Sequence, residues 1–340
     1  MYREEPARVQ RALQAVSGSG NQIFKGADST GVVRTGAMGT TTGTDANGAL
    51  PTGPPEGVTN FRDLGGARGL GGAVVRRGVV FRSGSLEGLT PLGWEQLAEL
   101  GVRTIIDLRS QEEWVSAPTR PSEGLGVEVV GLPMWQEPTG AAAFTEEVFE
   151  QLPPGTSARE ALETYCDIKV AGYRAMVRTF PRVLGGVVSI LARLGGRPAL
   201  VHCAGGKDRT GLVCAVVLAA VGVDETEILD DYQRSRESVS SEPIERYRGG
   251  LERFGIRLED FLPICGAHRP ALIGALEEIS AIGGSVGGYL CGPGGVHPAE
   301  LERLRSTLLD AAVPGDGKPR PDLRPSPAAS SSPTTTRTER

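Results

Sequence analysis

The stretch ALVHCAGGKDRTGLVCAVVLAAVG, residues 199–222, passes from an apolar strand-like segment into a long apolar helix-like segment. The loop between them holds two glycines and the charged residues Lys207, Asp208 and Arg209. A short apolar run that ends in a glycine-bearing loop and continues as a helix is typical of a sheet with crossover helices.

The flanking sequence repeats this alternation of strand and helix. Strand patterns occupy residues 73–84, 103–109, 127–134 and 197–203, and helix patterns occupy residues 90–101 and 173–196 with an expected break near Pro181. Asp224 is expected to cap a further helix, and segment 298–312 has helical apolar spacing with proline near its start. The pattern predicts an α/β fold with a central, largely parallel sheet flanked by helices.

The two ends of the chain differ in composition from its middle. Residues 17–57 are rich in Gly, Thr, Ser and Pro, and the last segment has Pro and Ser/Thr runs. Such segments bury too little apolar surface to offset the entropy of ordering a chain. We therefore expect a disordered N-terminal arm at residues 1–56, one ordered domain at 57–312 and a disordered tail at 313–340.

Charge and cysteine content exclude several functions. The net charge of -5 gives no global attraction to nucleic acid, so any anion site must be a local cluster. The five cysteines are widely spaced, without a CxxC pair or zinc-ligand spacing, and no metal site or cofactor is expected. The N-terminus lacks the apolar region of a signal peptide, and the longest apolar run is about half of a membrane span. These features predict a cytoplasmic protein with no transmembrane segment and reduced thiols.

Cys203 and Arg209 lie where an open α/β sheet binds its ligands, beyond the carboxyl end of a strand and at a helix N-terminus. Loop amides and a bidentate guanidinium would hold a tetrahedral oxyanion there, and the same field stabilises a thiolate. Gly205 and Gly206 permit backbone conformations that other residues resist. Thr210 is placed to donate its hydroxyl to the sulfur. Cys203 is thus a candidate nucleophile.

These residues carry a family resemblance. HCAGGKDRTG, residues 202–211, resembles the phosphate-binding signature Cys-x5-Arg followed by Ser/Thr of the cysteine-dependent protein tyrosine phosphatases, and in particular the bacterial enzymes with dual or lipid activity. The resemblance extends to NFRDLGG (60–66), VFRSGSL (80–86), LGVRTIIDLRS (100–110), DYQRS (231–235) and SVGGYL (285–290). It covers essentially the whole predicted domain and implies metal-independent hydrolysis of phosphate monoesters through a phosphocysteine.

The resemblance also implies roles for single residues. Cys203 would attack phosphorus, and Arg209 would bind the equatorial oxygens. The phosphate loop would consist of Ala204, Gly205, Gly206, Lys207 and Thr210 around the backbone amides of residues 204–209.

The general acid is less determined, because the chain has no Trp-Pro-Asp loop. Asp208 ranks first, since a loop aspartate is the proposed acid in the lipid-phosphatase branch. Glu137 ranks second, since relatives can carry an acidic residue after the strand end at Leu132–Pro133. Reach decides between acids, and the sequence does not give it.

Other residues in these motifs are expected to be structural. His202 is predicted to hydrogen-bond loop backbone, and Cys214 to pack in the core. Asp63, Asp107 and Arg109 are predicted to fix strands by ion pairing. Residues 135–172 are predicted to form either a lid over the site or a surface insertion.

Phosphotyrosine is the leading substrate, and Lys207 makes phosphoserine, phosphothreonine or phosphoinositides alternatives. A catalytically silent phosphate-binding module is the alternative from another class. A sulfur-transfer or arsenate-reducing enzyme is disfavoured because no resolving-cysteine pair is apparent. A nucleotide-binding P-loop is disfavoured because Lys207 is followed by Asp and the GxxxxGK frame is absent.

Overall fold

A computed structural model of the chain describes residues 53–134, 152–153, 155–236 and 248–310. Residues 1–52 of the predicted arm and the whole predicted tail at 313–340 lie outside the described residues.

Five strands form the main sheet, in the order β1-β3-β6-β4-β5. Their bounds are β1 Arg62–Asp63, β3 Val80–Ser83, β4 Thr104–Asp107, β5 Glu128–Gly131 and β6 Ala199–His202. Strands β3, β6, β4 and β5 are parallel, and only β1 runs antiparallel to its neighbour β3. His202 pairs in register with Ser83 on one side and Asp107 on the other, so three strands end together at one edge. The predicted α/β fold with a largely parallel sheet is confirmed.

The predicted single strand at residues 73–84 is wrong. It divides into β2, Val74–Val75, and β3, which belong to different sheets. Gly78 has φ +73 between them, and its amide donates to Asp63 Oδ2, so the chain turns there. β2 instead pairs antiparallel with β7, Leu309–Asp310, which ends the predicted C-terminal helix as a strand.

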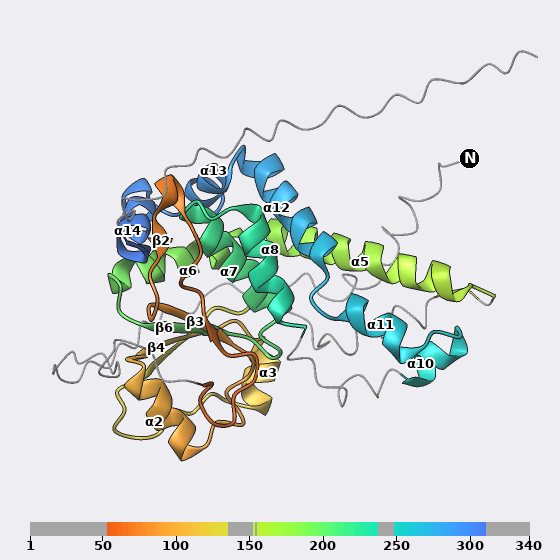
Figure 1. Cartoon of the computed structure of the whole chain (residues 1–340), viewed down its shortest axis with the longest axis horizontal. Coiled ribbons are helices and arrows are strands. Elements are labelled where there is room, and N and C mark those ends of the chain that lie inside the picture. The colour runs from red at the N-terminus through yellow and green to blue at the C-terminus, as the bar shows by residue number, and fades with distance from the viewer. Residues whose placement is uncertain (1–52, 135–151, 154, 237–247, 311–340) are drawn as a thin grey trace, which may run out of the picture.

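Helices cover both faces of the main sheet (Figure 1). On one face, Ile105 and Leu200 pack with Trp94 and Leu97 of α2, Pro91–Glu99, and α3, Gln111–Ser116, lies on the same side. The other face carries α6, Pro181–Leu194, α7, Asp208–Ala220, α8, Glu225–Arg234, α12, Arg269–Gly283, α13, Val286–Cys291, and α14, Pro298–Leu308. Alternation along each strand sends neighbouring residues to opposite layers.

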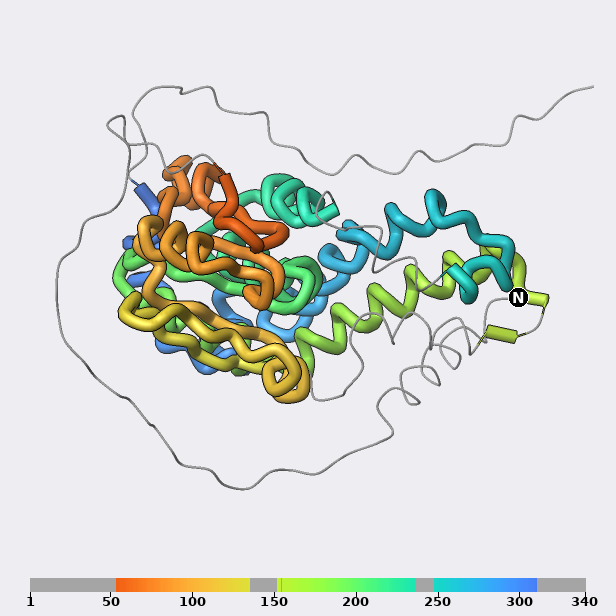
Figure 2. The backbone as a smooth tube through the Cα atoms, turned by 90° about the horizontal axis from the view of Figure 1, so that it is seen from below, coloured from red at the N-terminus to blue at the C-terminus, as the bar shows by residue number. Residues whose placement is uncertain are grey.

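A helical arm projects from this body (Figure 2). It consists of the N-terminal half of α5, Ala158–Thr179, with α10, Arg248–Arg253, and α11, Leu258–Cys265, and it has its own apolar cluster that includes Tyr165, Leu251 and Phe261. The C-terminal half of α5 runs into the body along α12. The arm therefore has a small core of its own beside the main one.

Two predicted helix features are present. α5 ends at Thr179 and α6 begins at Pro181, with a bend of 67° between them, as expected from the proline. Asp224 caps α8 by accepting a hydrogen bond from Thr226 N.

Among the described residues, no single helix has both the length and the apolar content to cross a membrane; only α5 and α6 together pass that test, across their bend.

Candidate active site

Cys203 lies at the carboxyl edge of the sheet, directly after the central strand β6. Its side chain is buried, and α7 begins five residues later at Asp208 with Lys207 as its N-cap. The free amides and positive dipole end of α7 therefore face the loop that follows Cys203. α7 therefore begins at Asp208, one residue before Arg209, which was the predicted first residue of this helix.

The loop has a shape that only glycine permits at Gly206. Its φ is +63, and a Cβ there would lie 2.3 Å from the carbonyl oxygen of Ser83. The neighbouring strand end also holds the loop, since Ser85 N donates to Ala204 O at 2.7 Å. The phosphate loop thus sits tightly against the end of β3.

Arg209 is held by a residue that the sequence analysis did not identify. Its Nη1 and Nη2 donate to the two carboxylate oxygens of Glu113 at 2.5 and 2.8 Å. Glu113 is itself fixed as the N3 residue of α3, where it forms a capping box with Ser110. Burial would raise the pKa of Glu113, but the hydrogen bond and charge of Arg209 lower it. Burial likewise opposes the charge of Arg209, whereas its hydrogen bond to Glu113 and the charge of Cys203 raise its pKa. Both groups are ionised, and the guanidinium is fixed beside the loop.

Lys207 contacts both the helical arm and the neighbouring Asp208. Its Nζ donates to Cys265 O at the end of α11 at 2.7 Å and lies 3.5 Å from Asp208 Oδ2. Lys169 from α5 reaches the same helix end and donates to Cys265 O and Gly266 O at 3.1 and 2.6 Å. Burial lowers the pKa of Lys169 to about 8, although Asp208 opposes this shift. Two ammonium groups therefore meet the carbonyl end of α11, where cations are favoured.

Asp208 is surrounded by partners for its carboxylate. Tyr173 donates to its Oδ1 at 2.7 Å, and the nitrogen of Lys169 lies 3.7 Å from the same atom. Burial would raise the pKa of Asp208, but Lys207, Lys169 and the Tyr173 hydrogen bond lower it. The predicted general acid thus has an environment that favours its ionised form.

A second tyrosine supports the first. The hydroxyls of Tyr173 and Tyr232 are 2.5 Å apart, and both rings are buried. Because a carboxylate only accepts, the Tyr173 proton goes to Asp208, and Tyr232 donates to Tyr173. A Cβ on Gly211 would come within 2.8 Å of the Tyr232 ring. The absence of a side chain at Gly211 therefore allows Tyr232 to occupy this position beside Tyr173.

His202, directly before Cys203, and Thr210, directly after Arg209, are both fully buried. Thr210 Oγ1 has no hydrogen-bond partner among the described residues, which leaves its proton for a sulfur or a ligand. His202 Nδ1 lies 3.3 Å from Cys203 O, and its Nε2 lies 3.4 Å from Asp107 Oδ2. His202 therefore contacts loop backbone, as predicted for a structural histidine.

The strand-end acids act differently from one another. Asp107 pairs with Arg109 at 2.7 Å in a buried cluster, as expected. Asp63 instead accepts hydrogen bonds from the amides of Gly65 and Gly78, each at 2.7 Å, because a turn folds around it. Cys214 packs in the main core, where burial raises the pKa of its thiol to about 11.

Two further predictions fall wholly or partly outside the described residues. Glu137, the alternative general acid, lies outside them, as do residues 135–151 of the segment that was expected to form a lid or an insertion. From residue 158 onward that segment is the first part of α5, which belongs to the arm.

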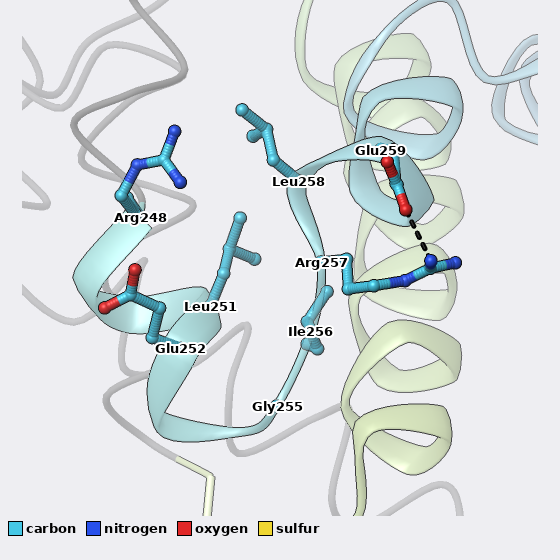
Figure 3. Close-up of a pocket in the computed structure, with 8 residues that line it drawn as sticks. All are labelled: Arg248, Leu251, Glu252, Gly255, Ile256, Arg257, Leu258 and Glu259. Atoms are coloured by element: carbon cyan, nitrogen blue, oxygen red, sulfur yellow. Dashed lines mark ion pairs between the residues drawn. The ribbon is translucent and has the colours of Figure 1, made fainter.

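A pocket of about 500 Å³ lies on the helical arm (Figure 3). Residues of α10 and of the turn into α11 line it, among them Leu251 and an ion pair between Arg257 and Glu259. None of its lining residues belongs to the loop after Cys203. The pocket is therefore separate from the loop after Cys203.

Glu113, Lys169, Tyr173 and Tyr232 were not predicted to contribute to this site. The capping-box spacing Ser110-x-x-Glu113 gives a local reason for Glu113 and none for its contact with Arg209. Lys169 and Tyr173 are four residues apart and so share one face of α5, which is the only signal of their common target.

Comparison with known proteins matches residues 54–310 to a family described as "Tyrosine phosphatase family". The chain is 33% identical over 275 residues to the "Triple specificity protein phosphatase PtpB" of Mycobacterium tuberculosis, an alignment that covers 74% of this chain and 97% of the relative. It is 30% identical over 239 residues to a protein of Cupriavidus necator named "Putative tyrosine-protein phosphatase", covering 68% of this chain and 80% of that relative.

Proposed function

The chain belongs to the tyrosine phosphatase family, and from that premise we propose that it hydrolyses phosphate monoesters through a phosphocysteine on Cys203. Its substrates are phosphorylated proteins or related phosphate esters. The observation that carries the mechanism is the junction of β6 and α7, where a buried cysteine, a helix N-terminus and the fixed guanidinium of Arg209 lie within seven consecutive residues.

In the first step the Cys203 thiolate attacks phosphorus and the bond to the leaving oxygen breaks. The loop amides and Arg209 bind the equatorial oxygens, whose charge is spread in the transition state. Glu113 accepts hydrogen bonds from Nη1 and Nη2 and holds the guanidinium in place, which leaves Nε–H to bind an oxygen of the substrate. This preorganisation lowers the barrier because no group has to reorient during the reaction.

Asp208 is the proposed donor of the proton to the leaving oxygen. Its lowered pKa means that the protonated form is populated mainly in acid, so catalysis of poor leaving groups strengthens as the pH falls. In the second step water attacks the phosphocysteine and gives its proton to the Asp208 carboxylate, while Thr210 donates to the departing sulfur. Glu137 remains the alternative acid.

Phosphotyrosine is the leading substrate, because its phenolate is a better leaving group than a serine or inositol alkoxide. A phenol has a pKa of about 10, so it leaves with less help from a sparsely protonated acid. The position of Lys207 beside the loop supports phosphoinositides as further substrates, since its ammonium offers a point charge for a second phosphate.

The test measures phosphate release from a phosphotyrosine peptide, a phosphoserine peptide and a set of phosphoinositides, without metal and with EDTA. We expect activity in the wild type and its loss in Cys203→Ser. Cys291→Ser, at a partly exposed cysteine of α13, is the matched control and should keep full activity. Activity that survives in Cys203→Ser would overturn the mechanism, and phosphopeptide binding without turnover in the wild type would favour a silent binding module.

A further inference from the structure

Three sequence motifs outside the phosphate loop meet behind it. NFRDLGG contributes Asn60 and Arg62, VFRSGSL contributes Arg82, and DYQRS contributes Asp231. Arg62 and Arg82 stand directly opposite each other on β1 and β3. Like charges in such a pair repel, so the arrangement requires a compensating acid. Asp231 from α8 supplies it, with Oδ1 at 2.7 Å from Arg62 Nε and Oδ2 at 2.6 Å from Arg82 Nη1.

Arg82 connects this cluster to the loop. Its side chain is fully buried, and its Nη2 donates to Gly206 O at 2.8 Å. Its Nε has no hydrogen-bond partner among the described residues. A buried donor without a partner costs stability, so it calls for an explanation such as a functional role of the charge. Burial would lower the pKa of Arg82, but the charges of Cys214, Asp231 and Cys203 raise it, so the guanidinium stays charged.

Asn60 makes a second connection. Its Nδ2 donates to Gly205 O at 3.0 Å, while its Oδ1 accepts from Arg62 Nη1. Its φ of +54 is the only positive value among the described residues other than glycine. Holding a non-glycine residue in this conformation costs free energy, which its side-chain contacts offset.

The two carbonyl contacts fix the direction of two amides. In a planar trans peptide the C=O and the following N–H point in opposite directions. When Gly205 O and Gly206 O are drawn back toward Asn60 and Arg82, the N–H groups of Gly206 and Lys207 turn to the other side of the loop. That side carries the oxyanion site of the proposed function.

The cluster also carries net charge. Two guanidiniums and one carboxylate leave one buried positive charge, and Arg82 and Cys203 lie close enough to interact. Among the described residues, Arg82 on β3 and Arg209 and Cys214 on α7 interact electrostatically with Cys203, and His202 on β6 lies 3.3 Å from the Cys203 carbonyl oxygen. Of these, Arg82 is the cation that reaches the loop from behind.

We propose that Asn60, Arg62, Arg82 and Asp231 form a clamp of positioning residues that sets the oxyanion affinity of the phosphate loop through the carbonyls of Gly205 and Gly206. The inference rests on the proposed function, because it assigns the oxyanion site to this loop. It gives a role to three motifs that do not touch the phosphate.

The experiment compares Arg82→Met, Arg82→Lys and Asn60→Gly with the wild type. Three quantities are measured: the Kd of tungstate by calorimetry, the pH profile of Cys203 alkylation by iodoacetamide, and the melting temperature. Arg305→Met is the matched control, since Arg305 also donates to a carbonyl, Ala220 O, but at the far end of α7. None of these readouts requires turnover.

We expect Arg82→Met to weaken tungstate binding by about 100-fold, the cost of a misplacement of roughly 1 Å. Its alkylation by iodoacetamide should slow, because the buried positive charge that interacts with Cys203 is lost. Arg82→Lys keeps the charge, so its alkylation profile should stay close to that of the wild type, but it cannot bind Asp231 and Gly206 O together and should lose tungstate affinity.

Asn60→Gly keeps the clamp testable if Arg82→Met does not fold. Glycine accepts the positive φ without strain, which offsets the loss of the Asn60 side-chain contacts, so this variant should nearly keep its melting temperature. Tungstate binding should weaken about tenfold, because the hydrogen bond to Gly205 O is lost. Wild-type tungstate affinity in both Asn60→Gly and Arg82→Lys would overturn the clamp. Activity retained in Cys203→Ser, with tungstate affinity lost in the clamp variants, would overturn the mechanism and leave the clamp intact.

Discussion

The hydrogen bond from Tyr173 to Asp208 makes the proposed general acid testable. Tyr173→Phe removes this bond, 2.7 Å long, without changing the shape of a buried ring. A hydrogen bond to a charged group is worth about 1.5–3 kcal/mol, and one pKa unit corresponds to about 1.4 kcal/mol. Because the Asp208 side chain is 26% exposed, water replaces part of the loss, and we expect the pKa of Asp208 to rise.

The direction of the effect on catalysis follows from the role of the acid. If Asp208 donates its proton to the leaving oxygen, the protonated form is the active one. Raising the pKa of Asp208 then moves the descending limb of kcat/KM to higher pH. The assay is kcat/KM for a phosphotyrosine peptide across that limb in wild type and Tyr173→Phe.

Tyr232→Phe is the matched control. It removes the donor to Tyr173 and leaves the bond from Tyr173 to Asp208 in place, so its limb should move less. An unchanged limb in Tyr173→Phe would refute the assignment of Asp208. Loss of the limb in Glu137→Gln would then assign the role to the alternative acid.

The same shift affects stability. The folded pKa of Asp208 lies below its ordinary value of 3.8, so its contribution to stability is complete above that value and is lost as the pH falls through the folded pKa. In Tyr173→Phe this contribution is smaller, and acid unfolding should begin at a higher pH, as measured by circular dichroism. Identical acid unfolding curves would contradict a stabilising contribution of Tyr173 to the Asp208 carboxylate.

Three further predictions concern the loop and its supports. Glu113→Gln keeps an acceptor for the α3 cap and removes the charge that fixes Arg209, so kcat/KM should fall at least about tenfold while the melting temperature changes little; wild-type kcat/KM would contradict this. Lys207→Ala should reduce phosphoinositide hydrolysis more than phosphotyrosine hydrolysis, and equal losses would remove the argument for a second phosphate. Gly206→Ala places a Cβ 2.3 Å from Ser83 O at a φ of +63, so urea unfolding should show a loss of about 1–3 kcal/mol, and an unchanged midpoint would contradict the strain.

The sequence by itself determined the four parallel strands of the main sheet and the position of the loop after Cys203. Short apolar runs, a glycine-bearing loop and an apolar helix follow each other at residues 199–222, and all of these signals are local. The seven residues from Cys203 to Arg209 wrap one site because they are contiguous, so no distant contact was needed to find them. The tails, the cytoplasmic location and Glu137 stay predictions.

The arm and the division of segment 73–84 were not predictable in this way. α10 and α11 are short, and α11 contains Pro263, so neither has a strong helix pattern. They are stable against α5 because their apolar residues share one cluster with it. The turn at Gly78 was not predictable, because the hydrogen bond from its amide to Asp63 joins residues that come together only in the folded chain.

Only the tertiary structure decided what surrounds the reactive loop. Glu113 lies 96 residues from Arg209 in the chain, and Tyr173 lies 35 residues from Asp208. Arg82 reaches Gly206 across 124 residues. Local patterns fix where a strand or helix forms, whereas the charge and orientation of a catalytic group depend on side chains that other elements bring to it, and that placement follows from how the layers pack.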